Sequence, residues 1–171
     1  MTPRKFFSLI VILAVVALSG CGGGGDDGGG GGDTTPIPAQ PVRATVLIAF
    51  DPTVTNLAGL DFVLNSAPGA AFDNNTQQIA AINAAQGQSL VVGNFNAVTN
   101  TNHIILANGS AAGIDTGTTP IIRITYDVAA GSGVPTFGIA SQATFTAIAP
   151  DNSPVTPAVT AANQAVTVTY E

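Results

Sequence analysis

From residue 42 onward, short β-type runs alternate with turn residues, and this pattern constrains the fold more than any other feature. The clearest run is Ile121–Val128, IIRITYDV, in which apolar and polar residues alternate strictly. A period of two predicts a strand with one buried and one solvated face, as in antiparallel sheets. The predicted inward residues are Ile122, Ile124, Tyr126 and Val128, and the predicted outward residues are Arg123, Thr125 and Asp127.

Further runs of the same kind predict the remaining strands. They are Arg43–Phe50, Leu60–Asn65, Leu90–Phe95, His103–Ala107, Pro135–Ile148 (divided near Ser141) and Ala165–Tyr170. The one helix-like window, Thr76–Gln86, is equally compatible with a strand and a short turn. Strands of this length, separated by Gly, Pro, Asn and Asp, predict an all-β sandwich.

The N-terminal residues 1–20 have the organisation of a bacterial lipoprotein signal peptide. Arg4 and Lys5 precede an apolar run that is too short to span a bilayer comfortably, and Leu18-Ser19-Gly20-Cys21 matches a lipobox. We therefore expect Cys21 to be lipidated and to anchor the protein. The alternative is an ordinary secreted protein with an incidental free cysteine.

Residues 21–41 predict a flexible linker between the anchor and the domain at 42–171. Glycine, aspartate and proline dominate this stretch, which cannot bury apolar surface and should therefore be disordered. Gly22 follows Cys21 where lipoproteins retained in the inner membrane favour Asp. By analogy this indicates the outer membrane, facing either the periplasm or the outside.

The charge balance excludes whole classes of partner. Of four basic residues only Arg43 and Arg123 follow the signal peptide, against ten acidic residues. So acidic a chain cannot neutralise phosphates, which excludes nucleic acid, and it should not bind anionic membranes electrostatically. One cysteine permits neither an internal disulfide nor a thiolate metal cluster.

The sequence carries no pattern of catalytic residues, and we expect no enzyme. The single histidine, His103, is expected to be a surface or edge residue, and no serine lies in a nucleophile-elbow context. Most Asp residues lie in turn sequences, where Asp is common anyway. We expect no cofactor; calcium at Asp73-Asn74-Asn75 or Asp151-Asn152 is the open alternative, although turn formation also explains these oxygen-rich stretches.

Aromatic residues are too few for a planar carbohydrate-binding strip. The chain has no Trp, and Tyr126 and Tyr170 fall on predicted core faces. Phe72 and Phe95 are left as the candidate exposed aromatics and hence as candidate glycan contacts.

Several segments together resemble the cohesin domains of the carbohydrate-binding-module β-sandwich superfamily. The segments are AGLDFVLN, HIILANGS, GTTPIIRITYDVAAG and the final run from PTFGIASQ to AVTVTYE. The resemblance implies a jelly-roll sandwich of about eight or nine strands and recognition of a protein through a sheet face. The family's well-known partner is a dockerin.

The leading hypothesis is therefore a membrane-anchored module that binds an envelope or secreted protein. We predict that its contacts include Arg123, Thr125 and Asp127, because Arg123 is one of two cations on an acidic domain. The competing interpretation is that Arg123 only pairs with a neighbouring Asp. A module that binds envelope polysaccharide is the alternative function, and a hydrolase, which would need converging carboxylates, is the third.

Overall fold

The computed structural model describes residues 40–73 and 77–171, which lie in one compact unit. The signal peptide, Cys21 and nearly all of the linker lie outside the described residues. None of the helices found in the described residues is long and apolar enough to cross a membrane.

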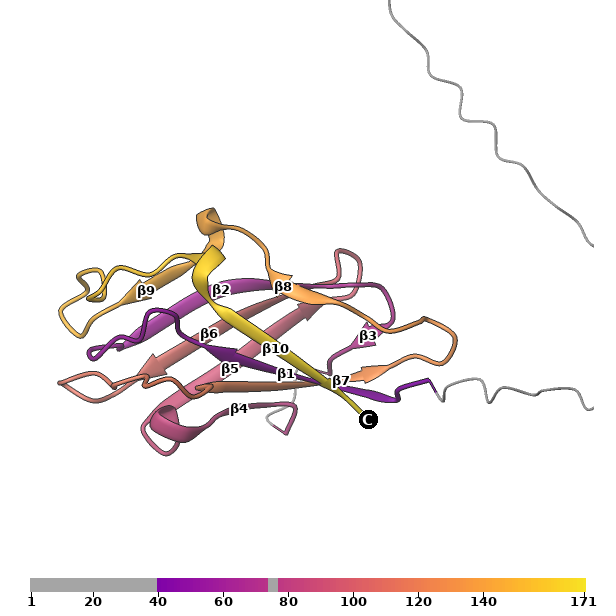
Figure 1. Ribbon diagram of the computed structural model, residues 1–171, viewed down its shortest axis with the longest axis horizontal. Coiled ribbons are helices and arrows are strands. Elements are labelled where there is room, and N and C mark those ends of the chain that lie inside the picture. Colours follow the sequence, from indigo (N-terminus) through magenta and orange to yellow (C-terminus); the bar gives the residue numbers. More distant parts are fainter. Residues whose placement is uncertain (1–39, 74–76) are drawn as a thin grey trace, which may run out of the picture. The chain divides into compact units, whose positions relative to one another are not determined.

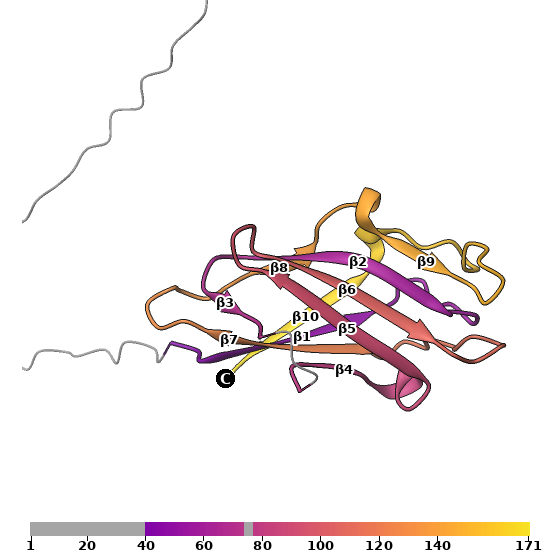
Figure 2. The same cartoon turned by 180° about the vertical axis from the view of Figure 1, so that it is seen from behind.

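Ten antiparallel strands form two sheets within the described residues. The β1 sheet has the order β10-β1-β7, with β3 and β4 both paired to β7, and the β2 sheet has the order β5-β6-β2, with β8 and β9 both paired to β2. The strands are β1 (Arg43–Ala49), β2 (Gly59–Ser66), β3 (Ala70–Ala71), β4 (Ile79–Ala81), β5 (Ser89–Asn96), β6 (Thr101–Asn108), β7 (Ile122–Val128), β8 (Phe137–Ile139), β9 (Thr146–Ile148) and β10 (Ala165–Tyr170). Figure 1 shows β10 nearest the viewer, and Figure 2, from behind, shows β5 and β6 nearest.

The core lies between the sheets and is built from alternate residues of the long strands. On β7 the buried residues are Ile122, Ile124, Tyr126 and Val128, as the alternation predicts. They face the alternate residues of β2 and β6, namely Leu60, Phe62, Leu64, Ile104 and Leu106, all at most 2% exposed. The period of two therefore decides which half of each strand is removed from water.

The all-β antiparallel sandwich is confirmed, but the strand number is ten rather than eight or nine. The two strands without a clear sequence signal are β3 and β4, with two and three residues. In the described part of the helix-like window, β4 is followed by a short 3₁₀ turn, η1 (Asn83–Ala85). The division of Pro135–Ile148 is also confirmed, because η2 (Gln142–Thr144) separates β8 from β9. A third turn, η3 (Ala161–Asn163), precedes β10.

The prediction that Tyr170 belongs to the core is wrong. This residue is 39% exposed, because β10 lies at the edge of its sheet and the facing sheet does not cover its end. Its hydroxyl donates a 2.5 Å hydrogen bond to the carbonyl of Pro135, which ties the end of β10 to the segment before β8.

The expectation that Phe72 is an exposed aromatic is also wrong. Its side chain is 4% exposed, and its ring packs against Tyr126 with the centroids 5.5 Å apart. Phe95 is half-buried and meets the same tyrosine edge-on at 6.1 Å. Both rings pack against Tyr126: Phe95 comes from β5, and Phe72 comes from the residue directly after β3.

Candidate interaction surface

The outer face of the β2 sheet carries an unusual number of exposed apolar side chains. Leu90 is 68% exposed, Val92 43% and Ile105 40%. In the sheet register Leu90 lies opposite Ala107, and Val92 lies opposite Ile105, so the side chains form one continuous patch. We call the surface formed by Leu90, Val92, Ile105, Ala107 and Ile148 the apolar face.

A shallow groove of about 370 Å³ runs across this face beside β2. Its lining includes Gly59, Ile105, Ala107, Thr146 and Ile148. Gly59 is required here because a Cβ atom at this position would lie 2.8 Å from Cγ1 of Ile148. Glycine thus lets Ile148 of β9 lie close over β2 and form one wall of the groove.

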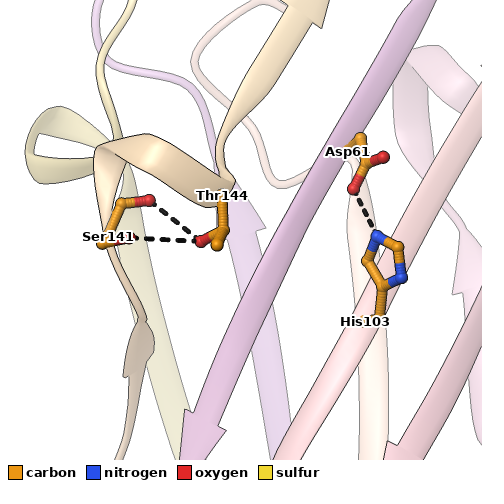
Figure 3. A network of polar contacts seen from close by, with 4 residues as sticks. All are labelled: Asp61, His103, Ser141 and Thr144. Atoms are coloured by element: carbon orange, nitrogen blue, oxygen red, sulfur yellow. Dashed lines mark hydrogen bonds and ion pairs between the residues drawn. The ribbon is translucent and has the colours of Figure 1, made fainter.

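One polar pair lies beside the apolar residues. His103 of β6 and Asp61 of β2 approach to 2.5 Å between Nε2 and Oδ1, and their side chains are 47% and 49% exposed (Figure 3). The prediction that His103 lies at the surface is confirmed. Asp61 lies opposite Ile105 in the register, so the pair borders the patch directly.

The His103–Asp61 pair has no nucleophile hydrogen-bonded to it among the described residues. The nearby hydroxyls drawn in Figure 3 belong to Ser141 and Thr144, which bond each other: Thr144 Oγ1 donates to the Ser141 carbonyl at 3.1 Å. A hydrolytic triad needs a hydroxyl within hydrogen-bonding reach of the histidine. The described geometry therefore offers a hydrogen-bonded His–Asp pair beside an apolar surface.

The sequence-predicted contacts lie on the opposite side of the sandwich. Arg123 and Asp127 are exposed and Thr125 is half-buried, all on the outer face of the β1 sheet. Gln78 Nε2 donates to Asp127 Oδ2 at 3.5 Å, and the Thr125 N–H donates to the Gln78 carbonyl at 2.7 Å. A polar hollow of about 390 Å³ lies beside Thr125 and Asp127.

Arg123 forms no ion pair with any residue that the structure describes. Its register neighbours are Leu47 on β1 and Ala80 on β4, neither of which carries charge. The other cation, Arg43, lies 3.8 Å from a carboxylate oxygen of Glu171. Among the described residues, the interpretation that Arg123 pairs with a neighbouring Asp is wrong.

A buried hydrogen-bonded pair, Asn102 and Tyr126, lies between the two sheets. Asn102 of β6, 1% exposed, donates from Nδ2 to the Tyr126 hydroxyl at 2.9 Å. Burial raises the pKa of the Tyr126 hydroxyl far above its ordinary value, and the hydrogen bond with Asn102 opposes this in smaller part. The Asn102 Oδ1 atom has no hydrogen-bond partner among the residues that the structure describes.

The two oxygen-rich turns differ in how much of them the structure describes. At Asp151-Asn152 the Ser153 N–H donates to Asp151 Oδ1 at 3.0 Å, and Asn152 adopts a φ of 64°. Hydrogen bonds from the hydroxyl and then the N–H of Ser153 hold the pKa of Asp151 below its usual range. Asn74 and Asn75 lie outside the described residues, and the described residues contain no group of three acidic, His or Cys side chains positioned to hold a metal ion.

Comparison with known proteins gives a likeness of structure. No protein-family model matches the chain, and no curated protein matches it. Among solved structures, a type II cohesin domain from the cellulosome of Acetivibrio cellulolyticus superimposes with a TM-score of 0.54 over 75% of this chain and 87% of that one. The fold is cohesin-like. Because the sequences are only 11% identical, the likeness is one of fold.

The apolar face could be predicted only in part from the sequence. The run HIILA in β6 is apolar on both faces, which could have signalled an exposed patch. The pairing of His103 with Asp61 carried no such signal. It depends on how β2 and β6 align in the sheet, which brings together two residues that are 42 positions apart in sequence.

Proposed function

We propose that this protein is a non-catalytic lipoprotein, anchored through Cys21 in the outer membrane, whose cohesin-like sandwich binds a protein partner of the cell envelope. The observation that carries the proposal is the apolar face, where Leu90, Val92 and Ile105 are each at least 40% exposed on adjacent strands. Contiguous exposed apolar side chains, bordered by polar ones, are typical of protein-binding surfaces. The cohesin-like fold and the resemblance to cohesins, whose partners are dockerin-bearing proteins, support the same function.

The charge distribution indicates what kind of protein would fit. Three of the ten acidic residues, Asp26, Asp27 and Asp33, precede residue 40, which leaves seven in the domain against two arginines. On the apolar face itself the nearest carboxylate, Asp61, is already paired with His103. The matching partner presents apolar side chains to this face and carries net positive charge, because the domain as a whole has seven acidic residues against two arginines.

The outer face of the β1 sheet is the second candidate surface. The specific observation in its favour is that Arg123 is exposed and pairs with no described acidic group. An unpaired guanidinium on an acidic domain would select a carboxylate on the partner. The glycan alternative loses support, since Phe72, one of its two candidate contacts, is buried.

A photo-crosslinking experiment in cells separates the two surfaces. A benzophenone side chain would replace Ile105 on the apolar face, Arg123 on the β1 sheet or, as a control, the loop residue Val98, which is 91% exposed. The proposal predicts a discrete protein adduct from position 105 and none from position 98. A protein adduct from position 123 alone would indicate that the partner binds the β1 sheet. A glycan adduct from position 105, or no adduct from that position, would contradict the proposal.

A further inference from the structure

Strand β10 leaves one of its two backbone edges without a partner among the described residues. Arg43 and Glu171 exchange two backbone hydrogen bonds, of 3.2 and 3.0 Å. Because antiparallel bonds alternate along a strand, Thr169 and Thr167 also bond to β1. The N–H and C=O groups of Val166, Val168 and Tyr170 therefore point away from the sheet, and no described residue bonds them.

The other sheet edges are short or covered. β3, β4, β8 and β9 have only two or three residues each. The long strand β5 also lies at an edge, and β4 runs alongside it. Short and covered edges are the usual protection against unwanted strand pairing.

β10 is longer than these short edges. It lies beside β8, and its Tyr170 hydroxyl bonds the Pro135 carbonyl, but no described residue hydrogen-bonds its outward backbone groups. Its six residues, AVTVTY, include no charge and no proline, and Thr167, Thr169 and Tyr170 are exposed. In Figure 1 the strand crosses the near side of the molecule as an outer element. β-branched and aromatic residues in an open, uncharged edge strand favour the addition of another strand.

We propose that a second copy of the chain pairs its own β10 with this edge, antiparallel and related by a two-fold axis through Val168. In this register Val168 faces Val168 of the second copy, and Val166 faces Tyr170 of the second copy. Each chain contributes three free N–H groups, so the pairing forms six hydrogen bonds and uses every free backbone group of both edges. The two β1 sheets become one continuous sheet.

The side chains fit the same register. On the outer face the register forms two Thr167–Thr169 pairs, one on each side of the two-fold axis. On the inner face Val168 pairs with Val168 and Val166 with Tyr170, which are favourable cross-strand combinations. Glu171 lies opposite Ala165 of the second copy, so no like charges face each other. The two Glu171 residues are roughly 20 Å apart at 3.4 Å per residue, beyond the Debye length in physiological salt.

This self-complementarity is the reason to name a second copy as the occupant. A single strand pair buries less area than standard stable interfaces, so the dimer is weak and its population depends on concentration. The inference does not depend on the proposed function, because β10 belongs to the β1 sheet and the apolar face to the β2 sheet.

Disulfide trapping tests the register directly. Full-length chains carrying Cys21→Ser would receive either Thr167→Cys or Thr169→Cys, and equal amounts would be mixed and oxidised. The expected product is a mixed disulfide dimer, several-fold more abundant than the dimer formed by either variant alone. The control mixes Val98→Cys with Val134→Cys, two exposed loop positions. A mixed dimer no more abundant than this control overturns the proposal.

A second measurement does not depend on new cysteines. The sedimentation mass of the Cys21→Ser chain should rise toward that of a dimer with increasing concentration. Thr167→Lys/Thr169→Lys, which places lysines opposite each other across the two-fold axis, should remain monomeric. Leu90→Lys/Val92→Lys on the apolar face is the matched control and should still dimerise. A chain that is monomeric at every concentration, or equal dimerisation of both lysine pairs, contradicts the proposal.

Discussion

Replacing Tyr126 by Phe should destabilise the protein through one hydrogen bond. The phenyl ring can keep its contacts with Phe72, Phe95 and Phe137, whose centroids lie 5.5, 6.1 and 4.8 Å from that of Tyr126. The lost hydroxyl is the acceptor for Asn102 Nδ2, and Asn102 Oδ1 already has no partner within residues 40–73 and 77–171. The variant therefore leaves a whole buried amide unsatisfied.

The magnitude follows from the cost of a buried polar group without a partner, which is about 1–3 kcal/mol. For a domain of this size, such a loss lowers the melting temperature by roughly 3–12 °C. The assay is urea unfolding followed by far-UV circular dichroism. Because no surface is added or removed, the midpoint should fall while the m-value stays constant.

The double variant Tyr126→Phe/Asn102→Leu provides the control. Removing both polar groups eliminates the unsatisfied amide, so the double variant should be more stable than Tyr126→Phe alone. A cost of less than about 0.5 kcal/mol for Tyr126→Phe would refute the reasoning, since the Asn102 amide would then have another partner. A double variant less stable than the single one would refute it as well.

Three further predictions concern the core, the pH dependence of stability and the anchor. Ile124→Ala, at a position with 0% exposure, should cost about 2–5 kcal/mol, and Thr125→Ala on the outer face about 0.5 kcal/mol or less; equal costs in denaturant titrations would contradict the assigned faces. The raised pKa of Tyr126 keeps its hydroxyl protonated in the folded protein, whereas the unfolded chain loses this proton near pH 10. Above pH 10 the free energy of unfolding should therefore fall by about 1.4 kcal/mol per pH unit. Tyr126→Phe should lack this dependence on pH. Metabolic labelling with a fatty acid should tag the wild type and not Cys21→Ser, and equal labelling of both would contradict lipidation.

The strands and their inner faces could be predicted because alternation is a local property. IIRITYDV in β7 and LDFVLN in β2 show it without ambiguity, and each strand appears where the pattern indicates. β3 and β4 are too short to alternate, and their pairing with β7 depends on residues more than 40 positions away. Length and register, which are set by tertiary packing, limit this part of the prediction.

The candidate site was harder to predict than the fold. The sequence identified Arg123 because charge is rare in this chain, and it is exposed as expected. It placed Phe72 at the surface because the residue lies on no predicted core face, but the Phe72 ring packs against Tyr126 in the core. The apolar face combines side chains of β5 and β6, which are paired in the sheet. The sequence of either strand alone does not predict the patch.

The central claim is that the apolar face binds a protein, and an equilibrium binding measurement tests it most directly. The protein captured by crosslinking at position 105 would be purified and titrated against the wild type, Ile105→Lys and Arg123→Glu. The account predicts that Ile105→Lys weakens binding at least about tenfold, as expected for a buried interface residue, while Arg123→Glu changes it by about twofold or less. Unchanged binding by Ile105→Lys, with full loss in Arg123→Glu, would contradict it.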